Sequence, residues 1–170
     1  MSVSVSTDSS RPVVSGLHHV GVSVRDLNRS LTFWEGFLGV SHRDPRSVSG
    51  DFIETLVGVP GIHLEIAWLD IPGGPALELV ENHADGADVV PAGTIHAGGV
   101  HFCLAVPDVA VALDRALAAG GTQASARIVE IPAGPFKGAR HVFVRDPDGA
   151  SIELRQPPAP VADSTIQGVS

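Results

Sequence analysis

The stretch Gly16-Leu-His-His-Val-Gly-Val-Ser-Val-Arg-Asp-Leu27 has a counterpart in Gly98-Gly-Val-His-Phe-Cys-Leu-Ala-Val-Pro-Asp-Val109, and this repeat decides the fold. In the alignment of the two stretches, residues 82 positions apart match: His19 with His101, Asp26 with Asp108 and, further along, Leu31 with Leu113. The offset stays constant from an apolar, β-branched run into a run with helical spacing. A repeat of this length indicates a duplicated structural unit.

Each copy predicts the same order of secondary structure. The apolar runs at 20–24 and 102–106 predict the first strand, because β-branched residues favour strands. Asp26 and Asp108 follow at the position of a helix N-cap, and apolar residues then recur at helical spacing as far as two glycines, Gly39 and Gly120. Further strand-like runs complete the copies, at 52–57, 63–69 and 76–81 in the first and at 126–131, 140–144 and 151–155 in the second.

The sequence therefore predicts an α+β fold made of two tandem βαβββ modules. We expect a single domain at 16–156, with modules at 16–82 and 98–156 and a linker at 83–97 that is rich in Ala, Gly and Pro. The two ends of the chain, 1–15 and 157–170, are polar or rich in proline, which predicts flexible tails.

The composition argues against several classes of function. The 170 residues include 11 Lys and Arg against 19 Asp and Glu, for a net charge of −8, and Lys137 is the only lysine. Without a basic patch, we expect no binding to nucleic acid or to an anionic membrane. The single cysteine, Cys103, excludes an intramolecular disulfide and a multi-cysteine zinc site. The first residues lack a signal-peptide pattern and no apolar run approaches a membrane span, which predicts a cytoplasmic protein.

Four residues at matching positions of the two copies are candidate metal ligands. His19 and His101 lie on the first predicted strand of each copy, and Glu78 and Glu153 lie on the last, each between large aliphatic residues. Because side chains alternate along a strand, both glutamates point away from the layer that their neighbours join. That face is either exposed to solvent or part of an enclosed groove. Two imidazoles and two carboxylates supply N and O donors, and a divalent cation would remove the repulsion between the carboxylates.

The motifs around these residues resemble the vicinal oxygen chelate superfamily, which has the glyoxalase and bleomycin-resistance fold. The resemblance lies in the stretches 19–27, 31–39, 76–79, 100–106, 134–138 and 146–154. It implies that the sheets of paired modules curl around a metal-binding groove and that the protein is a homodimer.

The same resemblance implies the ligands of one divalent ion (Ni, Co, Mn, Fe or Zn), which would be His19, Glu78, His101 and Glu153. The set is similar to those of bacterial glyoxalase I and methylmalonyl-CoA epimerase, and members that only sequester drugs often lack it.

Such a site predicts an enzyme that removes a proton next to a chelated carbonyl. Lewis-acid polarisation would stabilise the enolate or enediolate, as in an isomerase, an epimerase or a glyoxalase-type lyase that acts on a small oxygenated metabolite or thioester. The glyoxalase resemblance suggests Glu153 or Glu78 as the catalytic base. Further candidate bases are Glu54, His63, Glu65 and His141. Two alternatives stay open: an Fe(II) or Mn(II) dioxygenase of the same fold, and a small-molecule-binding or resistance protein without turnover.

Overall fold

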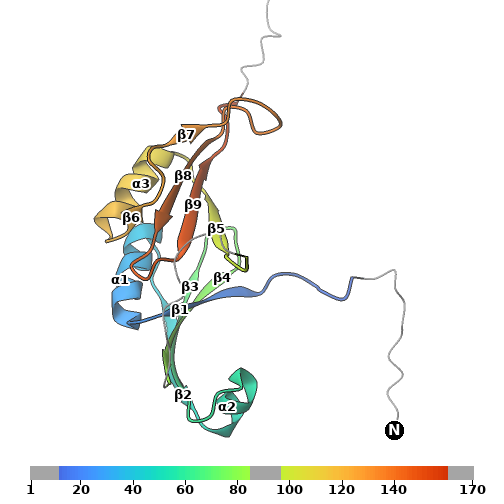
Figure 1. Ribbon diagram of the computed structural model, residues 1–170, viewed down its shortest axis with the longest axis vertical. Helices are drawn as coiled ribbons and strands as arrows, with labels where there is room; N and C mark the ends of the chain where they lie inside the picture. Colours follow the sequence, from blue (N-terminus) through green and yellow to red (C-terminus); the bar gives the residue numbers. More distant parts are fainter. Residues whose placement is uncertain (1–11, 85–96, 161–170) are drawn as a thin grey trace, which may run out of the picture.

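The computed structural model describes residues 12–84 and 97–160 (Figure 1). Most of the predicted tails and of the predicted linker lie outside these residues. The described residues form two sheets and three helices, arranged as two successive units along the long axis of the molecule (Figure 1). The prediction of an α+β fold with two βαβββ modules is confirmed.

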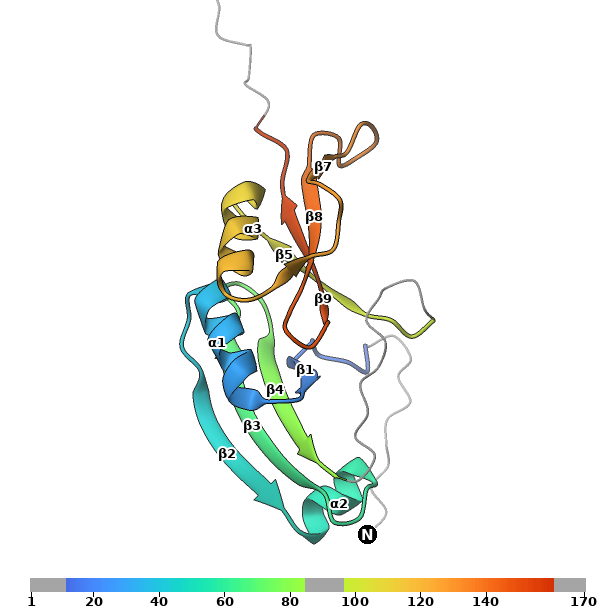
Figure 2. The same ribbon diagram turned by 60° about the vertical axis from the view of Figure 1, so that its left-hand side comes forward.

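The first module is a four-stranded sheet with two helices. The strands follow the order β1-β4-β3-β2, in which β1 is parallel to β4 and the other pairs are antiparallel. Figure 2 shows the three longer strands curving together, with α1 in front of them and α2 at their far end. The elements are β1 (His19–Val24), α1 (Leu27–Leu38), β2 (Arg43–Ser49), α2 (Asp51–Val57), β3 (His63–Asp70) and β4 (Ala76–His83).

The second module repeats this plan with shorter strands. Its sheet follows the order β5-β9-β8-β6, with β5 parallel to β9, and β7 pairs with β8 beside β6. The elements are β5 (His101–Ala105), α3 (Val109–Ala118), β6 (Thr122–Gln123), β7 (Val129–Glu130), β8 (Arg140–Arg145) and β9 (Ser151–Gln156). In both modules the strand that carries the predicted histidine ligand is therefore an edge of its sheet.

The main helices begin where the sequence predicts. An Asp26 oxygen accepts the N–H of Arg29 at 2.8 Å, and an Asp108 oxygen accepts the N–H of Ala110 at the same distance. These carboxylates satisfy backbone donors that the first turn of a helix leaves free. Gly39 ends α1 in the left-handed conformation, with a φ of 74°, which costs a glycine little.

The prediction of a strand at 52–57 is wrong, because residues 51–57 form helix α2. Ile53 is the buried residue of this helix and belongs to a small apolar cluster with Leu64 and Ile66 of β3, while Phe52 is exposed. The β-branched composition of the segment favours a strand locally. The contact of the buried Ile53 side chain with the sheet outweighs the local preference for a strand.

Three more strands differ from the predictions, one of them β6, a two-residue strand that was not predicted. Strand β2 was not predicted, because its sequence, RDPRSVS, has no apolar alternation. As the other edge of its sheet it is almost entirely exposed, so it needs no apolar face. The strand predicted at 126–131 is reduced to β7, a two-residue pairing with β8.

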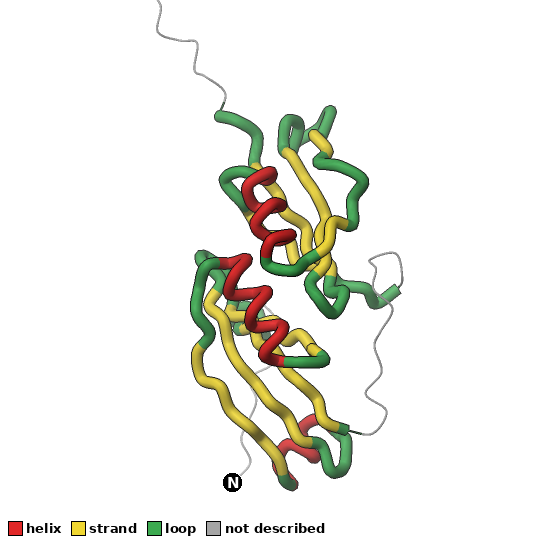
Figure 3. The backbone as a smooth tube through the Cα atoms, turned by 90° about the vertical axis from the view of Figure 1, so that its left-hand side faces the viewer, coloured by secondary structure: helices red, strands yellow, loops and turns green. Residues whose placement is uncertain are grey.

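One hydrophobic core joins the two modules. It combines fully buried residues of α1, such as Phe33 and Trp34, with fully buried residues of the second sheet, such as Val144 and Ile152. Helices α1 and α3 lie on the same side of the two sheets (Figure 3), and Nε of Arg115 in α3 donates to a backbone carbonyl of α1 at 2.8 Å.

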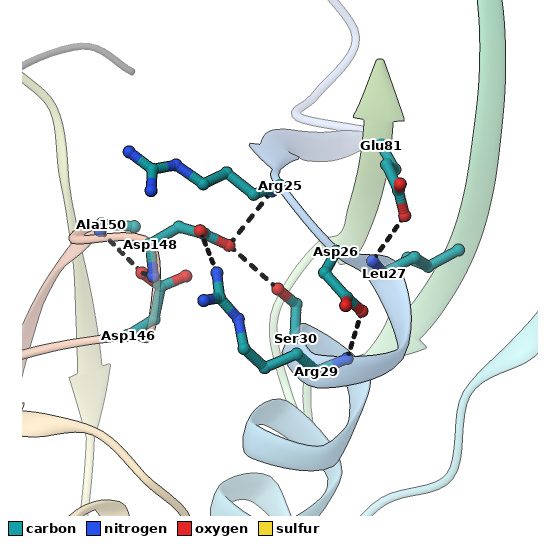
Figure 4. Close-up of polar contacts among 9 residues, drawn as sticks. All are labelled: Arg25, Asp26, Leu27, Arg29, Ser30, Glu81, Asp146, Asp148 and Ala150. Carbon is teal, nitrogen blue, oxygen red and sulfur yellow. Dashed lines mark hydrogen bonds and ion pairs between the residues drawn. The ribbon is translucent and has the colours of Figure 1, made fainter. Parts of the chain in front are cut away.

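The β8–β9 turn also reaches the start of α1 (Figure 4). One oxygen of Asp148 accepts the N–H of Arg25 at 3.3 Å and the hydroxyl of Ser30 at 3.1 Å, and the other forms an ion pair with Arg29. These contacts fix the second module against the first. None of the helices in 12–84 and 97–160 has the length and apolar character needed to cross a membrane.

Candidate metal centre

The first module places His19 and Glu78 next to each other on neighbouring parallel strands. Glu78 of β4 is in register with Gly21 of β1, and Nε2 of His19 lies 3.4 Å from Oε2 of Glu78. Trp68, opposite Glu78 on β3, packs edge-on against the His19 ring with the ring centroids 5.0 Å apart. The leucines on either side of Glu78 are fully buried, so Glu78 faces away from the core, as strand alternation requires.

The second module repeats this pair and adds to it. Nε2 of His101 lies 3.3 Å from Oε2 of Glu153, which is in register with Cys103 of β5. Phe143, opposite Glu153 on β8, packs edge-on against the His101 ring, at 5.4 Å between centroids. The other oxygen of Glu153, Oε1, lies 2.5 Å from Nδ1 of His141. We call the two His–Glu pairs the first and the second half-site.

The two half-sites do not meet within one chain. Of the four predicted ligands, no three offer ligand atoms within 4.8 Å of one another. The structure brings each histidine together with the glutamate of its own module, so a joint site of all four stays a prediction.

The donor atoms of each half-site fit a divalent ion. Imidazole nitrogens and carboxylate oxygens bind such ions at about 2.0–2.2 Å, which places neighbouring ligands roughly 3.0–3.4 Å apart. The two His–Glu spacings, 3.4 and 3.3 Å, agree with this value. They are longer than the ~2.9 Å of most N–H···O hydrogen bonds. The residues present therefore fit a divalent ion.

The second half-site binds its carboxylate more firmly than the first. Burial by itself would raise the pKa of Glu153, but hydrogen bonds from His141 and Cys103 and the charge of nearby histidines outweigh burial and lower it. Burial and the negative charge of Glu153 raise the pKa of the Cys103 thiol. Among the described residues, Nε2 of His141 is buried and has no hydrogen-bond partner.

A second group of ligand-type side chains, which we call the outer cluster, lies on β3 and β4. Atoms of Glu65, Glu81 and His83 lie within 4.8 Å of one another, and the His63 ring stacks on His83 at 5.2 Å between centroids. Glu81 already has a structural role, because its Oε2 accepts the N–H of Leu27 at 2.7 Å at the start of α1 (Figure 4). From the sequence, His63 and Glu65 were predicted only as candidate bases. In the structure Glu65 belongs to the outer cluster and His63 packs against it.

Sequence reasoning missed the contacts of two histidines. His141 was a candidate base, but nothing in the sequence showed that it lies against Glu153. The two side chains meet diagonally, because His141 pairs with Arg155 and Glu153 lies two residues before Arg155 on β9. Strand alternation predicts that His18 points away from His19. Instead their Nδ1 atoms are 2.8 Å apart, because β1 begins at His19 and alternation does not extend to the residue before it.

An apolar groove of about 760 Å³ adjoins the second half-site. Its walls include His101 and Cys103 of β5, Phe37 of α1 and the turn at 71–75 between β3 and β4. A groove of this volume is large enough for a small organic molecule.

Comparisons with known proteins show which proteins this chain is similar to. Residues 16–154 match the model of the glyoxalase/bleomycin resistance protein/dioxygenase superfamily. A probable lactoylglutathione lyase of Synechocystis sp. is 33% identical over 143 residues, which cover 82% of this chain and 94% of that protein.

Among solved structures, a glyoxalase family protein of Bacillus cereus superposes with a TM-score of 0.73 at 18% identity, covering 88% of this chain and 99% of that one. Glyoxalase I of Zea mays superposes with a TM-score of 0.54 at 22% identity, covering 83% of this chain and 44% of that one. At these identities the two structures show the shared fold alone.

Proposed function

Because this chain belongs to the glyoxalase/bleomycin resistance protein/dioxygenase superfamily, we propose that it is a divalent-metal-dependent isomerase, epimerase or glyoxalase-type lyase. The observation that carries the proposal is the pair of matched half-sites, each with an imidazole nitrogen and a carboxylate oxygen at ligand spacing. Members of the superfamily that only bind drugs often lack these ligands. A complete set therefore favours an enzyme over a resistance protein.

The ion would be held by His19, Glu78, His101 and Glu153, with the first half-site of one chain facing the second half-site of another. Three features support a homodimer of this kind. The half-sites lie apart within the chain, and the strands that carry their histidines, β1 and β5, are open sheet edges. In addition, the residues before β1 run away from the sheets (Figure 1), with Val13 and Val14 strongly exposed.

A bound divalent ion would supply Lewis acidity that polarises a carbonyl group and makes the neighbouring C–H acidic. A glutamate carboxylate of the centre then accepts that proton and returns it to another carbon, or to the opposite face of the same carbon. Groups positioned for such transfers contribute about 10²–10⁴-fold to the rate. The aromatic rings of Trp68 and Phe143 pack against the two histidines and hold them in place.

The substrate class that fits is a small α-hydroxy carbonyl compound or a thioester with a neighbouring oxygen. Two vicinal oxygens would chelate an ion that His19, Glu78, His101 and Glu153 hold. The apolar groove beside His101 would take the carbon skeleton. The relative from Synechocystis sp. is named a probable lactoylglutathione lyase, so S-lactoylglutathione is a suitable probe of the thioester class.

The test combines metal analysis with proton exchange. We expect the purified protein to bind one divalent ion per pair of half-sites, and to exchange the α-proton of S-lactoylglutathione or dihydroxyacetone for deuterium in D₂O only when loaded with metal. Binding of metal without exchange on any α-hydroxy carbonyl probe would favour the resistance protein. A preparation that contains iron and consumes oxygen would favour the dioxygenase.

A further inference from the structure

The two glutamates of the proposed centre occupy matching places but have different neighbours. Strands β3 and β4 match β8 and β9 at a constant separation of 75 residues, which relates Trp68 to Phe143 and Glu78 to Glu153. Both glutamates have similar exposure, with 18% and 17% of the side-chain surface accessible. Differences in their roles must therefore come from the residues that touch them.

Glu153 is held on both sides. His141 approaches one carboxylate oxygen at 2.5 Å and His101 approaches the other at 3.3 Å, while Cys103 lies opposite Glu153 on β5. The short contact with His141 fixes one carboxylate oxygen, so movement of Glu153 would break a hydrogen bond that the fold provides.

Glu78 has the matching contact with its own histidine but no counterpart of His141. The residue that corresponds to His141 is Ile66, and the residue that corresponds to Cys103 is Gly21. Across 12–84 and 97–160, the structure records one polar contact for the Glu78 carboxylate, with His19. Gly21 also leaves room, since a Cβ at this position would have only Oε2 of Glu78 near it, at 3.5 Å.

We propose that the two glutamates divide the work of the centre: Glu153 is the fixed ligand, and Glu78 is the mobile carboxylate that takes the substrate proton. The inference rests on the proposed metal-dependent function. In the reaction, the C–H bond next to the carbonyl breaks, its electron pair moves into the enolate, and the proton goes to an oxygen of Glu78. The neutral Glu78 carboxyl then returns the proton to carbon, so that no external acid, base or oxidant is needed.

The same comparison makes His141 a positioning residue. It lies on β8 behind Glu153 and reaches the oxygen that does not face His101. A hydrogen bond to a metal-binding carboxylate orients the ligand, and loss of such a partner typically lowers metal affinity about 10–100-fold.

The first experiment compares Glu78→Gln with Glu153→Gln, both made with His83→Ala so that the outer cluster does not bind a second ion. Calorimetry with Co²⁺ measures affinity, and exchange of the α-proton of S-lactoylglutathione and of dihydroxyacetone in D₂O measures catalysis. We expect Glu153→Gln to lower the Co²⁺ affinity far more than Glu78→Gln. We expect Glu78→Gln to retain bound Co²⁺ but to lose about 10²–10⁴-fold in exchange.

The second experiment tests the positioning role. We expect His141→Ala to lower the Co²⁺ affinity about 10–100-fold and His141→Asn, whose amide N–H occupies the place of Nδ1, to restore most of it. Ile66→Val, at the matching position of the other module, is the control and should leave the affinity unchanged.

The outcomes separate this inference from the proposed function. A wild-type protein that binds no Co²⁺ at these residues would overturn both. If wild type binds Co²⁺, equal losses of affinity in the two glutamine variants, or unimpaired exchange in Glu78→Gln, would overturn the division of work alone. If wild type exchanges neither probe, the Co²⁺ affinities of the two glutamine variants still test the division of work. The inference requires Glu153→Gln to bind Co²⁺ more weakly than Glu78→Gln.

Discussion

Asp146 is a carboxylate buried in the β8–β9 turn, with 3% of its surface exposed. One oxygen accepts the backbone N–H groups of Asp148 at 3.0 Å and Ala150 at 2.7 Å (Figure 4), and among the described residues the other oxygen has no partner. Burial raises the pKa of Asp146, and the backbone hydrogen bonds offset this only in part. The Asp146 carboxylate therefore holds the turn through these hydrogen bonds, although burial disfavours its charged form.

This raised pKa predicts a specific pH dependence of stability. When the folded-state pKa of a carboxyl lies above its unfolded value, its contribution to the free energy of unfolding is present at low pH and is lost as the pH rises through the folded-state pKa. Asp146→Asn keeps an oxygen for the N–H groups and is neutral at every pH. From about pH 4 upward, urea unfolding should therefore show the variant gaining stability relative to wild type.

The control for this prediction is Asp114→Asn, which changes an exposed carboxylate on α3. Its stability relative to wild type should stay nearly constant over the same pH range. If the difference in unfolding free energy between Asp146→Asn and wild type did not grow with pH, burial of the charged Asp146 carboxylate would have no net cost.

At the scale of single residues, the internal repeat predicted the four candidate ligands, because a histidine and a glutamate occupy matching positions in the two copies. It did not find the contact of His141 with Glu153. That contact depends on β8 pairing with β9 in one particular register, and the register follows from the turn and the packing rather than from a motif.

At the scale of elements, the helices were predictable because local signals agree: aspartate caps begin α1 and α3, and a left-handed glycine ends α1. The segment at 52–57 was not predictable, because its β-branched residues favour a strand. Only the sheet beneath it shows that a single residue, Ile53, reaches an apolar cluster. A strand there would place alternate residues on that sheet, whereas α2 leaves Phe52 and Leu56 exposed.

The contrast between helix and strand gives a stability prediction. Ile53→Ala should lower the free energy of unfolding by about 2–3 kcal/mol, since it leaves a cavity under α2. Phe52→Ser should change it by no more than about 0.5 kcal/mol, because 74% of Phe52 is exposed. Urea denaturation measures both, and a large effect of Phe52→Ser with a small effect of Ile53→Ala would contradict the orientation of α2.

At the scale of the whole molecule, the sequence predicts two modules but not how they are arranged. A repeat is equally compatible with modules whose open faces meet within one chain and with modules joined through their helices. The structure shows the second arrangement: a shared core, α1 against α3, and the β8–β9 turn bound to the start of α1. In this packing β1 and β5 stay at the edges of their sheets, and 39% and 41% of the side-chain surfaces of His19 and His101 are exposed.

A complementation experiment tests whether the centre is shared between two chains. One variant, His19→Ala/Glu78→Ala, lacks the first half-site, and the other, His101→Ala/Glu153→Ala, lacks the second. If each centre combines a first half-site from one chain with a second from its partner, a mixed dimer has one centre with all four ligands and one with none. Random pairing of equal amounts then restores about a quarter of the wild-type centres.

The two variants, carrying different affinity tags, are co-expressed, and the mixed dimer is purified through both tags before bound Co²⁺ is measured. Each variant alone should bind no Co²⁺ at the centre, with His83→Ala present throughout to remove the outer cluster. The mixed dimer should bind one ion per two chains. If each centre lay within a single chain, every centre in the mixed dimer would lack two ligands. A mixed dimer that binds no more Co²⁺ than its parents would therefore show that the half-sites do not meet between chains.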